Sequence, residues 1–212
     1  KLPVRDDGTG VLAFGNPTDW LSVLAKVFEM GGPTAQEVWK STAKLFASTG
    51  PWSCTVEPAD TGFAGLCSSA LAAGTSAKVA LDAAVAMLKA QQSWEAELYG
   101  QKLTPLKIKR AGQVVEIEKK VETRDRTARA LTKALAGGDT VRTAFTVKGG
   151  QLLQATGRDA RKTLARYGAG GAGKAPLLTT ALMRHKGAEF LASFDVNSMA
   201  LRVLGKNKDL PG

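Results

Sequence analysis

The sequence predicts a mainly α-helical protein, with a helical bundle core, a small β-hairpin and flexible terminal arms. Apolar residues of the N-terminal half recur at the three- and four-residue spacing of a helix face. Residues 75–99 are rich in alanine and apolar nearly all round, which is typical of a helix at the centre of a bundle. Residues 103–121 instead alternate apolar and charged side chains, which is the two-residue period of a strand pair.

Four segments follow from these patterns. We expect a flexible N-terminal arm at 1–16, a helical core domain at 17–100, a basic region with the β-hairpin and two amphipathic helices at 101–176, and a C-terminal helix and tail at 177–212. The arm is polar and Gly-rich, and a second Gly-rich stretch marks a flexible linker before the last helix.

The core domain is expected to hold four helices. They cover 18–30, a segment from Thr34 to the break at Gly50-Pro51, a short stretch at 63–71, and 75–99. Thr34 and Glu37 have the spacing of a capping box at the start of the second helix. In the basic region, residues 140–147 fit either a strand or a helix, and the last helix is expected at 177–194.

Two amphipathic helices within 124–166 each carry a cationic stripe opposite an apolar one. Arg126, Arg129 and Lys133 share one face of the first helix, and Arg158, Arg161, Lys162 and Arg166 cluster on one face of the second, with Leu153, Ala160 and Leu164 opposite. Few acidic residues stand where they would pair with these cations at i,i+4 spacing. The stripes are either ordinary solvated helix faces or a surface for a polyanion.

The formal net charge of +10 is unevenly distributed along the chain. Residues 1–99 carry 7 Lys+Arg against 10 Asp+Glu, a net charge of −3, whereas residues 100–212 carry 22 against 9, a net charge of +13. The second half is therefore the part expected to meet phosphate, an anionic membrane or an acidic protein.

No motif indicates an enzyme, a cofactor or a metal site. Residues 168–174 fit the pattern GxxxxGK, but Ala175 lacks the hydroxyl that would ligate magnesium, and a helical segment rather than a strand precedes the loop. Cys54 and Cys67 have no further ligands at zinc spacing, so we expect two reduced, buried thiols, with a single bridge between them as the alternative. No apolar run approaches the roughly 20 residues that cross a bilayer. We expect no catalytic activity, no membrane and no small-molecule substrate.

The last predicted helix ends in Ala192-Ser193-Phe194-Asp195, and here the chain resembles the coat proteins of flexible filamentous plant viruses. In that family a helical core ends in a basic residue, an aromatic, Ala, any residue, Phe and Asp, whereas this chain has Phe190 and Leu191 at the first two positions. The Gly74-Thr75-Ser76 step into a long helix is similar to the family's layout, and residues 100–175 have no counterpart. The resemblance implies an α-helical subunit, a groove for single-stranded RNA, and an Asp195 that orients an arginine beside it.

These observations lead us to expect a coat or nucleocapsid protein of the virion or host cytoplasm. It would assemble with copies of itself and package single-stranded RNA, favoured over DNA, in a basic groove. The groove is expected to comprise Arg126, Arg129, Lys133, Arg158, Arg161, Lys162, Arg166 and Asp195. One alternative is a nucleic-acid-binding protein of the ribosome-associated or nucleoid type that does not polymerise. Another is an effector that binds membranes or acidic partners, although the Ala-rich faces offer little for a membrane.

Overall fold

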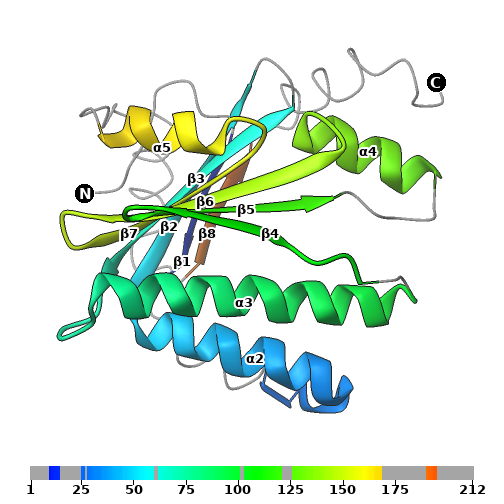
Figure 1. Cartoon of the computed structure of the whole chain (residues 1–212), viewed down its shortest axis with the longest axis horizontal. Coiled ribbons are helices and arrows are strands. Elements are labelled where there is room, and N and C mark those ends of the chain that lie inside the picture. Colours follow the sequence, from blue (N-terminus) through cyan, green and yellow to red (C-terminus); the bar gives the residue numbers. More distant parts are fainter. Residues whose placement is uncertain are drawn as a thin grey trace.

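The protein is a mixed α/β structure, so the prediction of a mainly α bundle is wrong. The computed structural model describes residues 10–14, 25–26, 28–59, 62–100, 103–120, 126–168 and 190–194. Within these residues, eight strands form one antiparallel sheet with the order β4-β5-β6-β7-β3-β2-β1-β8. Helices α2 and α3 cover one face of this sheet, and α4 and α5 cover the other (Figure 1).

The elements from α2 to α5 follow one another with short connections. In chain order they are β1 (Gly10–Phe14), α2 (Gly32–Ala47), β2 (Thr49–Pro58), β3 (Phe63–Leu71), α3 (Ala77–Leu98), β4 (Lys107–Ala111), β5 (Val114–Lys120), α4 (Arg126–Ala136), β6 (Thr140–Lys148), β7 (Gln151–Thr156), α5 (Ala160–Gly168) and β8 (Phe190–Phe194). Three of the strand pairs, β2–β3, β4–β5 and β6–β7, are hairpins. No helix among the described residues is long and apolar enough to cross a membrane.

Strand β3 replaces the short helix predicted at 63–71. It lies inside the sheet, between β2 and β7, and it is covered on both faces. Leu66 packs under α5, whereas the neighbouring Cys67 packs against the core on the α3 side. A strand that buries both faces loses the apolar–polar alternation that would identify it, and a short apolar run of this kind cannot be told from a helix by its period.

A continuous row of cross-strand neighbours shows how regular the sheet is. It runs from β4 to β8 through Arg110, Val115, Phe145, Gln154, Cys67, Cys54, Leu12 and Ala192. Cys54 and Cys67 stand directly opposite each other, with Cα atoms 4.0 Å apart, and they form a disulfide. The expectation of two reduced thiols is therefore wrong. The strand pairing that places these two residues together is not visible in the sequence alone.

Helix α3 confirms the predicted Ala-rich helix but packs on a sheet rather than inside a bundle. Ser76 caps it by accepting a hydrogen bond from the Val79 amide at 3.3 Å. Its small side chains, Ala80 and Ala84 among them, are fully buried against the strands and allow close approach to the sheet. Helix α2 packs on α3 and begins at Gly32, so Thr34 is inside the first turn instead of capping it.

The hairpin predicted at 103–121 is confirmed as β4–β5, with Gly112 in its turn at a φ of +59°. The ambiguous residues at 140–147 belong to strand β6. The second basic helix is shorter than predicted, because Leu153 lies in β7 and α5 begins only at Ala160. Leu153 still packs against Ala160 and Leu164, but it reaches them from the sheet.

The described ends of the chain also form strands. Strand β1 lies within the predicted N-terminal arm, and it pairs with β2 and β8. Strand β8 covers 190–194, where the sequence predicts the end of the last helix, so that part of the prediction is wrong. The rest of the predicted C-terminal helix and tail lies outside the described residues.

A candidate nucleic-acid interface

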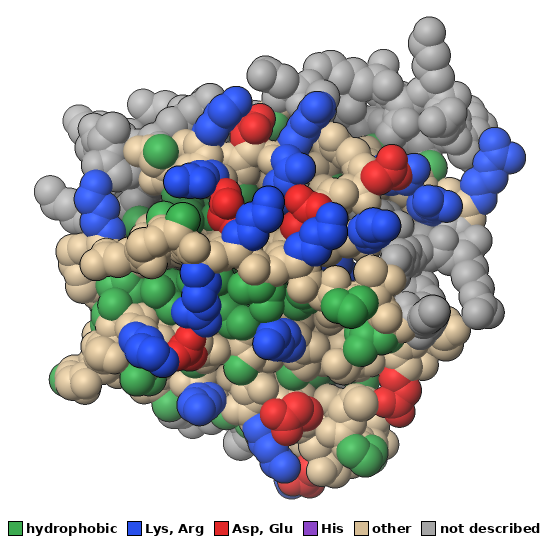
Figure 2. Space-filling model, in the orientation of Figure 1, with side chains coloured by type: hydrophobic (Ala, Val, Ile, Leu, Met, Phe, Trp, Pro, Cys, Tyr) green, Lys and Arg blue, Asp and Glu red, His purple; other side chains and the backbone are tan. Residues whose placement is uncertain are grey.

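A hollow of about 540 Å³ lies where the start of α5 meets strands β4, β5 and β6. We call it the basic hollow. Its cationic lining residues are Lys107, Lys109, Arg142, Arg158, Arg161 and Lys162, and its acidic ones are Glu116, Glu118 and Asp159. Figure 2 shows Lys and Arg side chains gathered in a band over this part of the molecule, with acidic side chains between them. The formal excess is three positive charges.

The β4–β5 hairpin supplies one side of the basic hollow because of its alternation. Lys107 and Lys109 are on one face of β4, while the intervening Ile108 packs against the core under the opposite face. The register sets Lys107 beside Glu118 and Lys109 beside Glu116 on β5. Charges of opposite sign therefore alternate across the strands instead of forming a uniform cationic patch.

Glu118 is the most strongly engaged acid of the basic hollow. Its carboxylate lies 3.2 Å from Arg142 Nε and 3.6 Å from Lys107 Nζ. The hydrogen bond from Arg142, with the charge of Lys107, holds the pKa of Glu118 below its ordinary value. Arg142 Nη1 also donates to the Arg158 carbonyl oxygen at 3.3 Å, which ties β6 to the turn before α5.

Helix α5 supplies the other side of the basic hollow. The amide and the hydroxyl of Thr163 donate to the Asp159 carbonyl oxygen, which fixes the first turn of the helix. Arg161 and Lys162 remain 62% and 76% exposed, and their ion pairs with Glu116 and Asp159 are long, at 3.8 and 3.6 Å. Lys109 has no ion pair with any residue that the structure describes. These cations are accessible to a ligand, and the positive end of the α5 dipole adds to their field.

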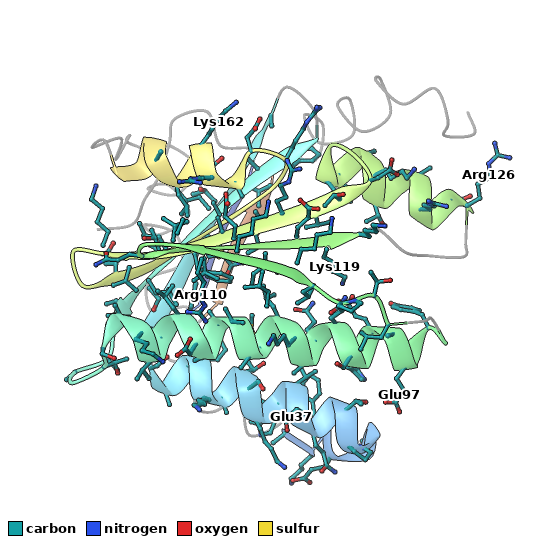
Figure 3. The ribbon with its side chains drawn as sticks, in the orientation of Figure 1. Glu37, Glu97, Arg110, Lys119, Arg126 and Lys162 are labelled. Carbon is teal, nitrogen blue, oxygen red and sulfur yellow. A yellow bond between two sulfur atoms is a disulfide. The ribbon has the colours of Figure 1, made fainter. Side chains whose placement is uncertain are left out.

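The cationic stripe of α4 lies on the same side of the sheet but does not line the basic hollow (Figure 1). Arg126 is exposed at the outer end of α4, and Lys162 projects from α5 (Figure 3). Lys133 is paired with Asp139, and the hydrogen bond from Lys133 holds the pKa of that carboxyl below its ordinary value. Arg129 adds to this effect through its charge. Part of the α4 stripe is therefore already neutralised.

The eight residues predicted as a single groove thus fall into separate groups. Arg158, Arg161 and Lys162 line the basic hollow, whereas Arg126, Arg129 and Lys133 belong to α4. Arg166 is on α5, but its side chain lies outside the described residues, and so does Asp195.

Sequence reasoning missed the cations that the strands contribute, Lys107, Lys109 and Arg142. The alternation of apolar and charged residues in 103–121 could have identified Lys107 and Lys109. A strand whose apolar residues face the core turns its charged residues to the other side. No local sequence pattern indicates that α5 lies over these strands, because that arrangement depends on the order of the strands in the sheet.

Comparisons with known proteins give no relative: no family model, no curated protein and no solved structure matches the chain. Among the described residues, no group of three or more His, Cys, Asp or Glu side chains is arranged to hold a metal ion.

Proposed function

We propose that the protein binds single-stranded nucleic acid, RNA by preference, through the basic hollow. One observation carries the proposal: among the residues that the structure describes, six cationic side chains from β4, β6 and the segment 158–162 line one hollow together with three acids. Lys and Arg in such a cluster neutralise phosphates and release the counterions that surround a nucleic-acid strand. Contacts of this kind position the backbone and tolerate any sequence.

Self-assembly around RNA, as in a coat protein, stays a prediction. The helical layout behind the viral resemblance is not the one that the chain adopts, because 63–71 and 190–194 are strands. The proposal therefore rests on the basic hollow and not on the resemblance. Negative-stain imaging of the protein with and without RNA separates the two outcomes: filaments or particles indicate a coat protein, and a small complex indicates a binder that does not polymerise.

The test is the affinity for a fluorescently labelled 20-nucleotide oligouridine, measured by anisotropy. We expect the double substitution Arg158→Glu and Lys162→Glu to weaken binding by about tenfold or more, which corresponds to about 1.4 kcal/mol. The matched control is Lys40→Glu with Lys44→Glu, because both lysines are exposed on α2, on the other face of the sheet, and the change in net charge is the same.

An equal loss in both variants would show that only the overall charge matters and would remove the basic hollow from the proposal. Vesicles that contain anionic lipid serve as the competing ligand. If they bind more tightly than the oligouridine, the membrane-binding alternative is correct.

A further inference from the structure

We infer that the basic hollow holds one whole nucleotide of the bound strand, with its phosphate against α5 and its sugar and base against the strands. This inference rests on the proposed function and adds the unit that is recognised. Backbone binding alone needs only a row of surface cations, whereas a nucleotide site also needs an enclosed volume and acceptors for its O–H and N–H groups.

The volume fits a small-molecule site rather than a flat cationic surface. Pockets for ligands of this size measure about 300–1,000 Å³, and the basic hollow measures about 540 Å³. Its inner wall includes Ala144 and Ala160, which are 0% and 3% exposed. Their side chains are short and close the floor of the hollow, and the apolar surface that is open to a ring is that of the exposed Ala165.

The cations at the start of α5 suit the phosphate. The ion pairs of Arg161 and Lys162 are 3.8 and 3.6 Å long, whereas strong charge-assisted hydrogen bonds measure about 2.7–2.9 Å. A phosphate can therefore replace the present partners and gain closer contacts. The amides of residues 160–162, which precede the Thr163 hydrogen bond, have no acceptor within the helix, and these residues line the same hollow.

Two of the three acids favour one orientation of the nucleotide, whereas the third, Asp159, lies on the α5 side, where three cations outnumber it. Glu116 and Glu118 are about one-third exposed and line the side of the hollow formed by the strands. Carboxylates repel a phosphate, but they accept hydrogen bonds from a ribose hydroxyl or a base amino group. The phosphate should consequently lie at α5, and the sugar and base should lie toward β5.

Ala165 provides a test that changes the volume and leaves every charge in place. It lines the basic hollow and is exposed, so a larger side chain there fills the hollow without disturbing the core. Ala165→Phe is the main variant, and Ala165→Leu is a smaller replacement in case the first one alters the fold. The matched control is Ala86→Phe, at an exposed position of α3 beyond the opposite face of the sheet.

The experiment measures how uridine monophosphate, uridine and inorganic phosphate displace labelled oligouridine from the full chain. We expect uridine monophosphate to compete at concentrations at least about tenfold lower than either fragment, since it occupies both parts of the site. Ala165→Phe should abolish this advantage, and Ala86→Phe should retain it. Circular dichroism checks that each variant is folded.

The outcomes distinguish the two proposals. If the unaltered protein binds no oligouridine, the proposed function fails. If it binds oligouridine but uridine monophosphate competes no better than phosphate, the nucleotide site is wrong and backbone binding stands. The nucleotide site is also wrong if both folded Ala165 variants keep the full advantage of uridine monophosphate.

Discussion

Replacing Gly157 by alanine should destabilise the fold and disturb the helix that carries part of the basic hollow. Gly157 is buried between β7 and α5 and has a φ of +128°, a conformation that residues with a side chain rarely adopt. A Cβ atom there would lie 2.7 Å from the Phe63 carbonyl oxygen and 3.2 Å from Ala64 Cα. Both are backbone atoms of β3, so no side-chain rotation relieves the overlap.

The magnitude follows from two contributions. The backbone conformation costs about 1–3 kcal/mol for a residue other than glycine, and forcing an atom into a packed region costs about 1–3 kcal/mol more. Gly157→Ala should therefore lower the free energy of unfolding by about 2–6 kcal/mol. Gly112→Ala is the matched control, because its φ is +59° and a Cβ atom there meets no heavy atom within 4 Å. That control should cost only about 1–2 kcal/mol.

Guanidinium denaturation followed by circular dichroism measures both changes, and oligouridine affinity supplies a second readout. The Gly157 amide donates to the Arg142 carbonyl oxygen at 2.9 Å, so a shift here moves the turn that holds Arg158 and should also weaken RNA binding. Gly112→Ala should leave RNA binding unchanged. Equal destabilisation by the two substitutions would refute the argument that close backbone contact at β3 requires a glycine.

Three further predictions concern the disulfide, pH and salt. Removing the Cys54–Cys67 bridge by reduction or by a double Cys→Ser substitution should lower the free energy of unfolding by about 2–4 kcal/mol, and a denaturation midpoint that does not move on reduction would contradict this. Because the folded-state pKa of Glu118 lies below its ordinary 4.5, its ion pairs stabilise the protein above that pH, and the stability is lost as the pH falls through the folded value. Acid titration of Glu118→Gln should accordingly show a shallower loss below pH 4.5 than the unaltered protein, and identical curves would argue against the interaction. Neutralising three to six phosphates should give a slope of roughly −2 to −4 in a plot of log affinity against log salt for single strands, whereas a flat plot would exclude phosphate contacts as the main source of affinity.

The sequence predicted those elements whose signals are local. Helix α3 was predicted because its cap at Ser76 and its small apolar residues are contiguous, and the β4–β5 hairpin was predicted because its alternation is contained within 103–121. Strand β8 was missed because its neighbour β1 comes from a distant part of the chain, and strand β3 was missed because both its faces are buried and one of its two neighbours, β7, is distant. A short apolar segment takes its conformation from such neighbours more than from its own propensity.

The candidate site was predicted in part for the same reason. The helical period identified Arg158, Arg161 and Lys162; Arg158 lies in the turn before α5, and the other two lie in its first turn. Lys107 and Arg142 were not predicted as their partners, because only the pairing of β4 with β5 and of β5 with β6 brings these side chains together. The charges were visible in the sequence, but their convergence depends on tertiary structure.

The uneven charge of the chain suggests two separable halves, yet the sheet joins them. Strand β3, from the first half, pairs with β7 along six residues from Gly65 to Ala70, and the larger core combines Leu45 and Trp52 with Phe145 and Leu152. A fragment of residues 101–212 would expose the edge of β7 and lose α3, which covers the apolar face of the β4–β7 strands. We therefore predict that this fragment shows no cooperative unfolding and binds RNA only weakly, and that mixing it with residues 1–100 restores both properties. A fragment that unfolds cooperatively and binds like the full chain would show instead that the basic half is an independent domain.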